Sequence, residues 1–237
     1  MIKKPKLSKT GKERKLDPRG IVRGEKTRVK TARYRKSSST RWLQRQLNDP
    51  YVAAAKRDGY RSRAAYKLLE LDEKFNFLHG VKSVVDLGAA PGGWTQVAAK
   101  ECAGDVRIVG IDLLDVAPVA GATILKMDFT TDEAEKALLE LIDGPVGLVM
   151  SDMAADTTGH QNTDYLRTIA LAELAFDFAT KVLVKNGTFV TKVFAGGTDN
   201  QLLDDIKKRF KTVRHYKPPA SRSESKETYL VAQGFLG

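Results

Sequence analysis

Five short apolar runs alternate with helical stretches along most of the chain, and this alternation limits its fold more than any other feature. Apolar runs of this length predict strands, and apolar residues at helical spacing between them predict helices. Repeated strand–helix–strand units imply a parallel sheet with right-handed crossovers. The predicted strands are 83–87, 107–113, 122–127, 146–151 and 188–194, and the predicted helices are 60–76, 94–99, 132–142, 165–184 and 200–210.

Two further apolar runs close the chain, at 212–216 and 227–233, with only a loop between them. Strands joined by a loop without a helix are expected to pair antiparallel, so these two predict a hairpin at the edge of the sheet. The sequence shows no internal repeat. We therefore predict a three-layer, doubly wound α/β domain over residues 51–237, with a mostly parallel sheet of seven strands and an antiparallel C-terminal hairpin.

Positive charge is concentrated at the start of the chain. The net charge is +11, but residues 1–50 hold 17 Lys and Arg against 4 Asp and Glu, whereas the rest of the chain is slightly acidic. Segment 1–50 has few large apolar residues, so we expect a largely disordered arm that binds RNA through phosphate contacts. The alternatives are a solubilising extension, an organelle import signal, or a segment that binds an acidic membrane surface, although the arm lacks an amphipathic apolar face.

Several classes of protein are excluded by composition. No apolar run is long enough to predict a membrane span, and no apolar stretch follows the basic start as in a secretory signal. Cys102 is the only cysteine and the three histidines are scattered, so neither a disulfide nor a zinc site is expected. A protein without a membrane segment, a disulfide or a metal fits a cytoplasmic location.

The segment 84–94 has the form of a ligand-binding loop. An apolar strand runs into Gly-Ala-Ala-Pro-Gly-Gly, and a helix is predicted from Trp94. Small residues such as Gly92 let a ligand approach the backbone, and the helix start offers free N–H groups. This Gly-Ala-Ala-Pro-Gly-Gly segment departs from the G-x-G-x-x-G pattern. It has proline where a pyrophosphate needs a backbone amide, so a dinucleotide is disfavoured as the ligand.

Acidic residues stand at the ends of three successive predicted strands: Asp86, Asp112 and Asp128. Asp112 lies 24 residues after Gly88, where a carboxylate accepts hydrogen bonds from ribose hydroxyls. Asp128, followed by Phe129, suits an adenine amino group with a ring beside the base. Such a set fits an adenosine ligand without phosphate, and S-adenosylmethionine is one whose sulfonium tolerates carboxylates. Alternatively, each aspartate caps a turn.

Two charged residues fall near the carboxyl ends of the last predicted parallel strands, where such sheets bind ligands. Asp152 follows the fourth strand, and Lys192 lies in the fifth among apolar neighbours. A charge there is costly unless it is paired or used. Lys67 in the leading helix and Glu227 at the start of the last strand could, on spacing alone, be ordinary surface charges.

Five motifs together resemble the FtsJ-like ribosomal RNA 2′-O-ribose methyltransferases. The resemblance covers roughly residues 50–237, with its motifs in order, and leaves out most of the basic arm. It implies a Rossmann-like fold and a methyltransferase activity that depends on S-adenosylmethionine and needs no metal. The motifs are 62–68 (SRAAYKL), 86–94 (DLGAAPGGW), 151–154 (SDMA), 192–194 (KVF) and 221–229 (SRSESKETY).

The resemblance also implies roles for particular residues. The catalytic tetrad of the family would fall on Lys67, Asp152, Lys192 and Glu227. The contacts to S-adenosylmethionine would fall on Gly92, Trp94, Asp112, Asp128 and Asp152. Without the resemblance, Trp94 could equally be a packing residue at the start of its helix.

The implied reaction moves a methyl group from S-adenosylmethionine to the ribose 2′-hydroxyl of a uridine in large-subunit (23S) ribosomal RNA during ribosome assembly, with the enzyme acting as a monomer. The hydroxyl must lose its proton as the new bond forms, and Lys192 is the candidate that takes or steers this proton. Burial, Lys67 and the sulfonium would disfavour the charged form of this lysine, whereas Asp152 and Glu227 would favour it. The sequence leaves this balance open.

Two alternative functions are compatible with the same residues. One is 2′-O-methylation of transfer RNA, of an RNA cap or of another RNA by the same tetrad. The other is a non-enzymatic RNA-binding assembly factor with a decayed site. The intact tetrad argues against decay, because a decayed site is expected to have lost at least one of its members.

Overall fold

The computed structural model describes residues 21, 27–29, 31, 36–102, 104–155, 158–194 and 200–237. The chain divides into two compact units, residues 1–59 and residues 60–237. The boundary predicted from the charge distribution lies a little earlier, after residue 50. Most of the predicted basic arm lies outside the described residues, so its expected disorder stays a prediction.

The N-terminal unit contains two helices, α1 (Ser37–Leu47) and α2 (Pro50–Asp58). The Asp49 carboxylate caps α2 by accepting the backbone N–H of Tyr51 at 3.0 Å. Gly59 ends this helix in the left-handed region, where a residue without Cβ is favoured. Neither helix is predicted from the sequence, because α1 and α2 lack the broad apolar stripe of a helix that packs on a large hydrophobic core.

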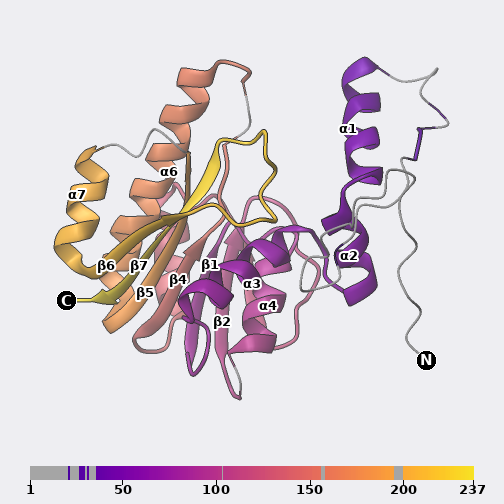
Figure 1. The fold of residues 1–237 in the computed structure, drawn as a ribbon. Coiled ribbons are helices and arrows are strands. Elements are labelled where there is room, and N and C mark those ends of the chain that lie inside the picture. The colour runs from indigo at the N-terminus through magenta and orange to yellow at the C-terminus, as the bar shows by residue number, and fades with distance from the viewer. Residues whose placement is uncertain are drawn as a thin grey trace. The chain divides into compact units, whose positions relative to one another are not determined.

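The second unit is the predicted doubly wound α/β domain (Figure 1). Its seven strands form one sheet in the order β3-β2-β1-β4-β5-β7-β6, and strands β1 to β5 run parallel. The predicted fold class is confirmed. The elements are α3 (Ala64–Phe75), β1 (Ser83–Leu87), α4 (Gly93–Glu101), β2 (Arg107–Asp112), β3 (Ala122–Lys126), α5 (Asp132–Leu141), β4 (Val146–Ser151), α6 (Gln161–Val182), β5 (Leu183–Phe194), α7 (Asn200–Arg209), β6 (Phe210–Tyr216) and β7 (Glu227–Phe235).

The two C-terminal strands pair antiparallel as predicted, but only β6 lies at the sheet edge. Strand β7 inserts between β5 and β6 and is antiparallel to both. This insertion sets Tyr229 directly opposite Lys192, and Glu227 opposite Phe194. The last strand therefore brings new side chains next to the carboxyl end of β5.

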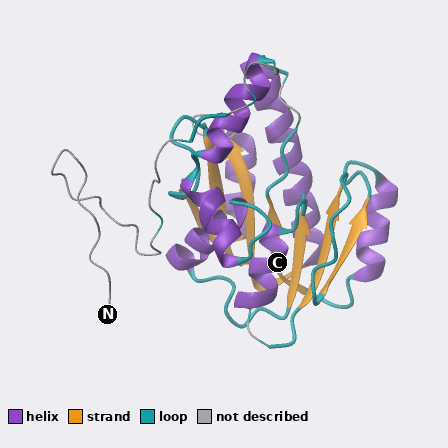
Figure 2. Cartoon of the chain, turned by 90° about the vertical axis from the view of Figure 1, so that its right-hand side faces the viewer, coloured by secondary structure: helices purple, strands orange, loops and turns teal. Residues whose placement is uncertain are grey.

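Helices cover both faces of the sheet (Figure 2). Successive residues of a strand point to opposite faces, so Val84 belongs to the core on the side of α3 and α4, while Val85 belongs to the core on the side of α5, α6 and α7. Because both faces are covered, the inner strands are mostly apolar, which explains why they read as continuous apolar runs. None of the helices described is both long and apolar enough to cross a membrane.

Candidate active site

The loop between β1 and α4 is packed too closely for larger residues. Gly88 has φ +80°, and a Cβ there would lie 2.8 Å from Cγ of Met153. A Cβ on Gly93, at the start of α4, would lie 2.6 Å from Oγ of Ser62. Glycine is therefore required at both positions, because side chains of the protein fill the space that a Cβ would take. Close approach of a ligand to this loop stays a prediction.

Asp112 and Asp128 both cap turns, and both also line one cavity. The two Asp112 oxygens accept the N–H groups of Ala90 and Leu114, each at 2.8 Å. Asp128 accepts the N–H and the hydroxyl of Thr130 at 3.0 and 2.7 Å, and these bonds hold the pKa of Asp128 below its ordinary value. The two explanations offered by the sequence are thus compatible, since a carboxylate oxygen has more than one lone pair to offer.

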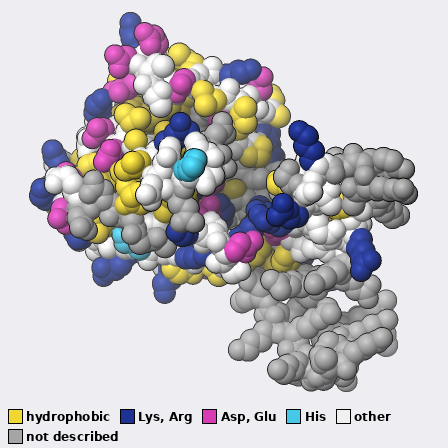
Figure 3. Space-filling model, turned by 90° about the horizontal axis from the view of Figure 1, so that it is seen from above, with side chains coloured by type: hydrophobic (Ala, Val, Ile, Leu, Met, Phe, Trp, Pro, Cys, Tyr) yellow, Lys and Arg dark blue, Asp and Glu magenta, His cyan; other side chains and the backbone are white. Residues whose placement is uncertain are grey.

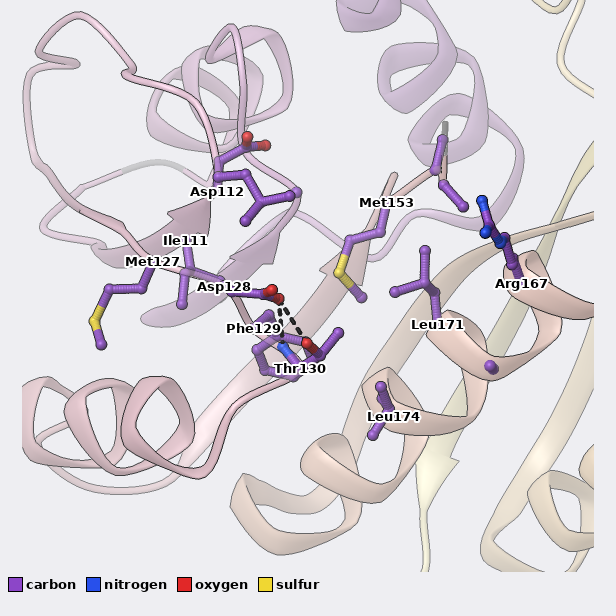
Figure 4. A pocket seen from close by; sticks show the side chains of 15 residues that line it. Ile111, Asp112, Met127, Asp128, Phe129, Thr130, Met153, Arg167, Leu171 and Leu174 are labelled. Carbon is purple, nitrogen blue, oxygen red and sulfur yellow. Dashed lines mark hydrogen bonds between the residues drawn. The ribbon is translucent and has the colours of Figure 1, made fainter. Parts of the chain in front are cut away.

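The cavity has a volume of about 430 Å³ and lies at the carboxyl ends of β1, β2 and β4, where the loops leave the sheet. Figure 4 shows Met153 between the strand side, with Asp112 and Asp128, and the helix side, with Leu171 of α6. Most of the wall is apolar. Its two acidic side chains are those of Asp112 and Asp128. The wall consists of Gly88, Ile111, Asp112, Leu113, Met127, Asp128, Phe129, Thr130, Met153, Ala154, Ala155, Arg167, Ala170, Leu171 and Leu174.

Asp86, the third acid of the predicted set, does not line this cavity. It lies within β1, is completely buried, and accepts the hydroxyl of Thr95 at 2.6 Å. Burial raises the pKa of Asp86 from 3.8 to about 7; the Thr95 hydrogen bond opposes the rise, and the charges of Asp152 and Asp112 add to it. Asp86 is therefore a buried group behind the loop and, unlike Asp112 and Asp128, is not part of the cavity wall.

Trp94 and Gly92 also lie outside the cavity wall. Trp94 is 3% exposed, and its indole N–H donates to the carbonyl of Ala64 at 2.9 Å. This geometry fits the packing alternative, because α4 is thereby fixed to α3. Gly92 is buried with φ +100°, and a Cβ there would meet the Arg61 guanidinium at 2.6 Å. Contacts of Trp94 and Gly92 with a cofactor stay predictions.

The four members of the predicted tetrad lie together in one cluster. The Lys192 ammonium is 3.0 Å from a carboxylate oxygen of Asp152 and 2.5 Å from its main-chain carbonyl oxygen. The Lys67 ammonium is 2.8 Å from the Glu227 carboxylate and 3.8 Å from that of Asp152. Helix α3, the end of β4, and strands β5 and β7 each supply one residue. Two cations and two anions thus alternate in one chain of contacts.

The charges in this cluster are sheltered and depend on one another. The side chain of Lys192 is 8% exposed and that of Asp152 is 17% exposed. Burial alone would raise the pKa of Asp152, but Lys192 and Lys67, with hydrogen bonds from Tyr229 and Lys192, hold it below its ordinary value. Asp152 is therefore ionised at neutral pH and holds both lysines in place.

Tyr229 is a fifth member that the sequence analysis did not select. Its hydroxyl donates to the Asp152 carboxylate at 2.7 Å, and burial raises its pKa well above the ordinary value. The Lys67 ammonium lies 5.6 Å from the centre of its ring. A signal did exist, because Glu227 and Tyr229 are two residues apart and so share one face of β7. Using it requires knowing that β7 pairs with β5.

The loop between β6 and β7 is fastened to α3, which carries Lys67. The backbone N–H of Ala220 donates to the buried Glu70 carboxylate at 2.6 Å, and Arg63 donates to the Ala220 carbonyl. Next to it, the Ser221 hydroxyl donates to Glu227 at 2.8 Å. These hydrogen bonds position Glu227 next to Lys67, although the two residues are far apart in the sequence.

The cavity and the cluster adjoin each other at the carboxyl edge of the sheet. Asp152 belongs to the cluster, and the next residues, Met153 and Ala154, line the cavity. Figure 3 looks down on this edge, where Lys and Arg side chains lie among apolar and acidic ones. A ligand in the cavity would therefore lie next to the cluster that contains Lys192.

Fold and site together define an α/β enzyme that binds a small ligand at the carboxyl edge of its sheet, beside a charged Lys–Asp–Lys–Glu cluster. Residues 60–235 match the family described as FtsJ-like methyltransferase, and the chain belongs to this family. It is thus a methyltransferase, whose reaction needs a methyl donor.

Relatives with similar sequences cover nearly the whole chain. The ribosomal RNA large subunit methyltransferase E of Novosphingobium aromaticivorans is 61% identical over 89% of this chain and 94% of its own. The protein of the same name from Erythrobacter litoralis is 63% identical over 89% and 95%. A solved ribosomal RNA methyltransferase from Plasmodium falciparum matches with a TM-score of 0.68 at 32% identity, covering 75% of this chain and all of the other.

Proposed function

We propose that this enzyme transfers a methyl group from S-adenosylmethionine to the ribose 2′-hydroxyl of a uridine in large-subunit ribosomal RNA. The observation that carries the proposal is the Lys192–Asp152–Lys67–Glu227 cluster directly beside the cavity. The names of the relatives, ribosomal RNA large subunit methyltransferase E, support the substrate class. A cytoplasmic location and a monomeric state are part of the proposal.

The cavity fits the proposed methyl donor. Its volume of about 430 Å³ is in the ordinary range for small-molecule sites. Asp112 would accept the ribose hydroxyls and Asp128 would accept the adenine amino group, with Phe129 beside the base and Gly88 in the same wall. When bound, S-adenosylmethionine supplies a methyl group on a positively charged sulfur. The negative charges in the wall favour such a ligand.

Lys192 is positioned to handle the hydroxyl of the acceptor. Among the described residues, the Asp152 carboxylate and carbonyl accept two of its ammonium hydrogens, which leaves a third for the acceptor oxygen. A donor fixed in this way orients the hydroxyl and stabilises the negative charge that develops on its oxygen as the C–O bond forms, the methyl–sulfur bond breaks and the hydroxyl proton passes to water. Lys67 adds a second positive charge near Asp152, and Glu227 and Tyr229 hold this arrangement. Alignment of the methyl group and the oxygen accounts for much of the expected rate.

The first test is transfer of tritiated methyl from S-adenosylmethionine to large ribosomal subunits, naked ribosomal RNA and transfer RNA. Wild type should label one ribose, stably to alkali, and Lys192→Ala should lower the rate by at least about 10²-fold while cofactor binding is kept. Lys185→Ala, an exposed lysine near the other end of β5, is the matched control. Labelling of transfer RNA alone would make transfer RNA the substrate in place of ribosomal RNA. Cofactor binding without labelling of any RNA would favour a non-enzymatic assembly factor.

We further propose that the basic segment 1–50 binds the RNA backbone. It carries 17 of the 40 Lys and Arg residues of the chain, which supports contacts with phosphate. Deleting residues 1–50 should lower the affinity for RNA and flatten its dependence on salt, because each lost phosphate contact removes a released counterion. A salt dependence equal to that of the full chain would contradict this role.

A further inference from the structure

Helix α1 presents an exposed aromatic ring among positive charges. The helix holds Arg41 and Arg45 and has no acidic residue. Trp42 is 56% exposed, and both arginines are exposed as well. Tryptophan is enriched where proteins meet partners, and an exposed tryptophan beside two positive charges indicates an interaction surface for a negatively charged, planar partner.

Another face of α1 is already used within the N-terminal unit. Gln44 accepts the N–H of Val29 at 3.0 Å and donates to the carbonyl of Thr27. Asn48 accepts the N–H of Thr27 at 2.7 Å and donates to its carbonyl at 2.9 Å. Residues 27–29 are thereby held along this face of the helix, and the exposed Arg28 between them stays close to α1.

The face that carries Trp42 is separate from this contact. Each residue turns an α-helix by about 100°, so Trp42 lies about 140° around the axis from the middle of Gln44 and Asn48. By the same rule Arg41 and Arg45 fall between the two. The segment 27–29 therefore leaves the Trp42 face uncovered, with the arginines along one side of it.

We propose that this face of α1 binds single-stranded RNA, with Trp42 stacking on a base and Arg41 and Arg45 contacting phosphates. The inference deepens the proposed RNA contact of segment 1–50, which contains α1, and rests on the proposed function in taking RNA as the partner. Aromatic side chains stack on any base, and flanking cations track the backbone, which is how single strands are bound without sequence preference. The absence of acids on α1 makes the whole helix complementary to a polyanion.

Tryptophan fluorescence tests the stacking directly, because the chain contains only two tryptophans. Trp94 is 3% exposed, so a quencher in solution, acrylamide, reports on Trp42. Poly(U) added to the full chain should protect Trp42 from acrylamide, and Trp42→Phe should remove the quenchable fraction. A Trp42 that is already shielded without RNA would mean that it docks on protein, and one that stays fully accessible with RNA bound would mean no stacking; either result overturns the proposal.

Affinity measurements separate the aromatic contribution from the ionic one. Trp42→Ala should weaken poly(U) binding roughly 5- to 100-fold, the range found for loss of one stacked base, and Trp42→Phe should retain most of the affinity. The pair Arg41→Gln and Arg45→Gln should reduce the slope of log affinity against log salt by about 1.4, since each phosphate contact on a single strand contributes about 0.7. Trp42→Ala should leave this slope unchanged.

Lys136→Gln, an exposed lysine on α5, is the matched control for loss of charge and should change neither quantity. Wild-type affinity in Trp42→Ala would overturn the proposal. Lys192→Ala separates it from the proposed function, because this variant should lose methyl transfer but keep RNA affinity and the protection of Trp42. If wild type methylates no RNA while poly(U) still protects Trp42, the proposed function fails and the RNA contact stands.

Discussion

In the two halves of the site, the cavity and the charged cluster, different kinds of interaction hold the acidic residues in place. In the cavity, main-chain N–H groups hold Asp112 and Asp128: those of Leu114 and Thr130 in their own loops and, for Asp112, also that of Ala90 in the loop after β1. In the cluster, Asp152 is held by the side chains of Lys192, Lys67 and Tyr229, which come from distant segments. The acids of the cavity are thus held by the main chain, whereas the members of the cluster are held by one another.

This difference predicts that a single change damages the cluster more than the cavity. Loss of a carboxylate held by main-chain N–H groups leaves no charged side chain without its partner. A charge held by other charges leaves its partners unsatisfied when it is removed, and a buried unpaired charge is costly.

Asp152→Asn should have the largest effect, because it leaves the two lysines without their shared carboxylate. Methyl transfer is expected to fall by about 10²- to 10³-fold, and unfolding free energy by about 3–5 kcal/mol, as for other broken buried pairs. Tritium incorporation and denaturant unfolding measure the two. Asp115→Asn is the control, because its ion pair with Lys126 is 83% and 57% exposed and should contribute less than about 1 kcal/mol. Equal effects of the two changes would contradict the contrast.

Asp86→Asn tests a buried carboxyl group whose negative charge is disfavoured by Asp112 of the cavity and by Asp152 of the cluster. The folded pKa is about 7 and the ordinary value 3.8, so between these pH values the folded chain holds a proton that the unfolded chain releases. Folding stability should therefore fall as the pH rises through this window, by about 1.4 kcal/mol per pH unit. Asp86→Asn removes this loss and should be the more stable form at pH 8, on the order of a few kcal/mol, with no such gain near pH 4.

Unfolding by urea at several pH values measures the effect of Asp86→Asn. The exposed Asp143, changed to Asn, is the control and should leave the pH profile unchanged. Parallel profiles for wild type and Asp86→Asn would show that burial does not shift Asp86 in this way.

Asp112→Ala should act only on the cavity and have the smallest effect of the three. It removes a carboxylate that would bind ribose hydroxyls, so the dissociation constant for S-adenosylmethionine should rise about 10- to 100-fold. Calorimetry measures this constant, with Asp115→Ala on the same loop as control. Turnover at saturating cofactor should stay near wild type if the cluster is independent of this residue. An unchanged dissociation constant would refute the ribose contact.

Much of the fold could be predicted because its strands read locally as apolar runs. The predicted limits of β1 and β4 match the structure, and those of β2 and β3 differ by one residue. Strand β5 begins at Leu183 instead of 188, because Lys185, Asn186 and Gly187 resemble a turn, and Asn186 does adopt a positive φ of 67°. Local patterns follow from local forces, and they fail where a strand passes through residues typical of loops.

The candidate site could be predicted only in part. The joint motifs selected Lys67, Asp152, Lys192 and Glu227, which the structure brings into contact. Tyr229 was missed because its role depends on β7 entering between two other strands, and this pairing leaves no local mark. The same argument covers Trp94, since only the packing of α3 on α4 shows where its indole points.

The position of β7 also makes activity depend on the synthesis of this strand. It is the last strand along the sequence, yet it lies inside the sheet and supplies both Glu227 and Tyr229. A ribosome therefore makes every other strand before the cluster can assemble, and an unfinished chain exposes the open edge of β5. Such a chain has its two lysines but neither of these partners. Methyl transfer is thus expected only after synthesis has passed β7, and a product cut short before this strand should be inactive on RNA.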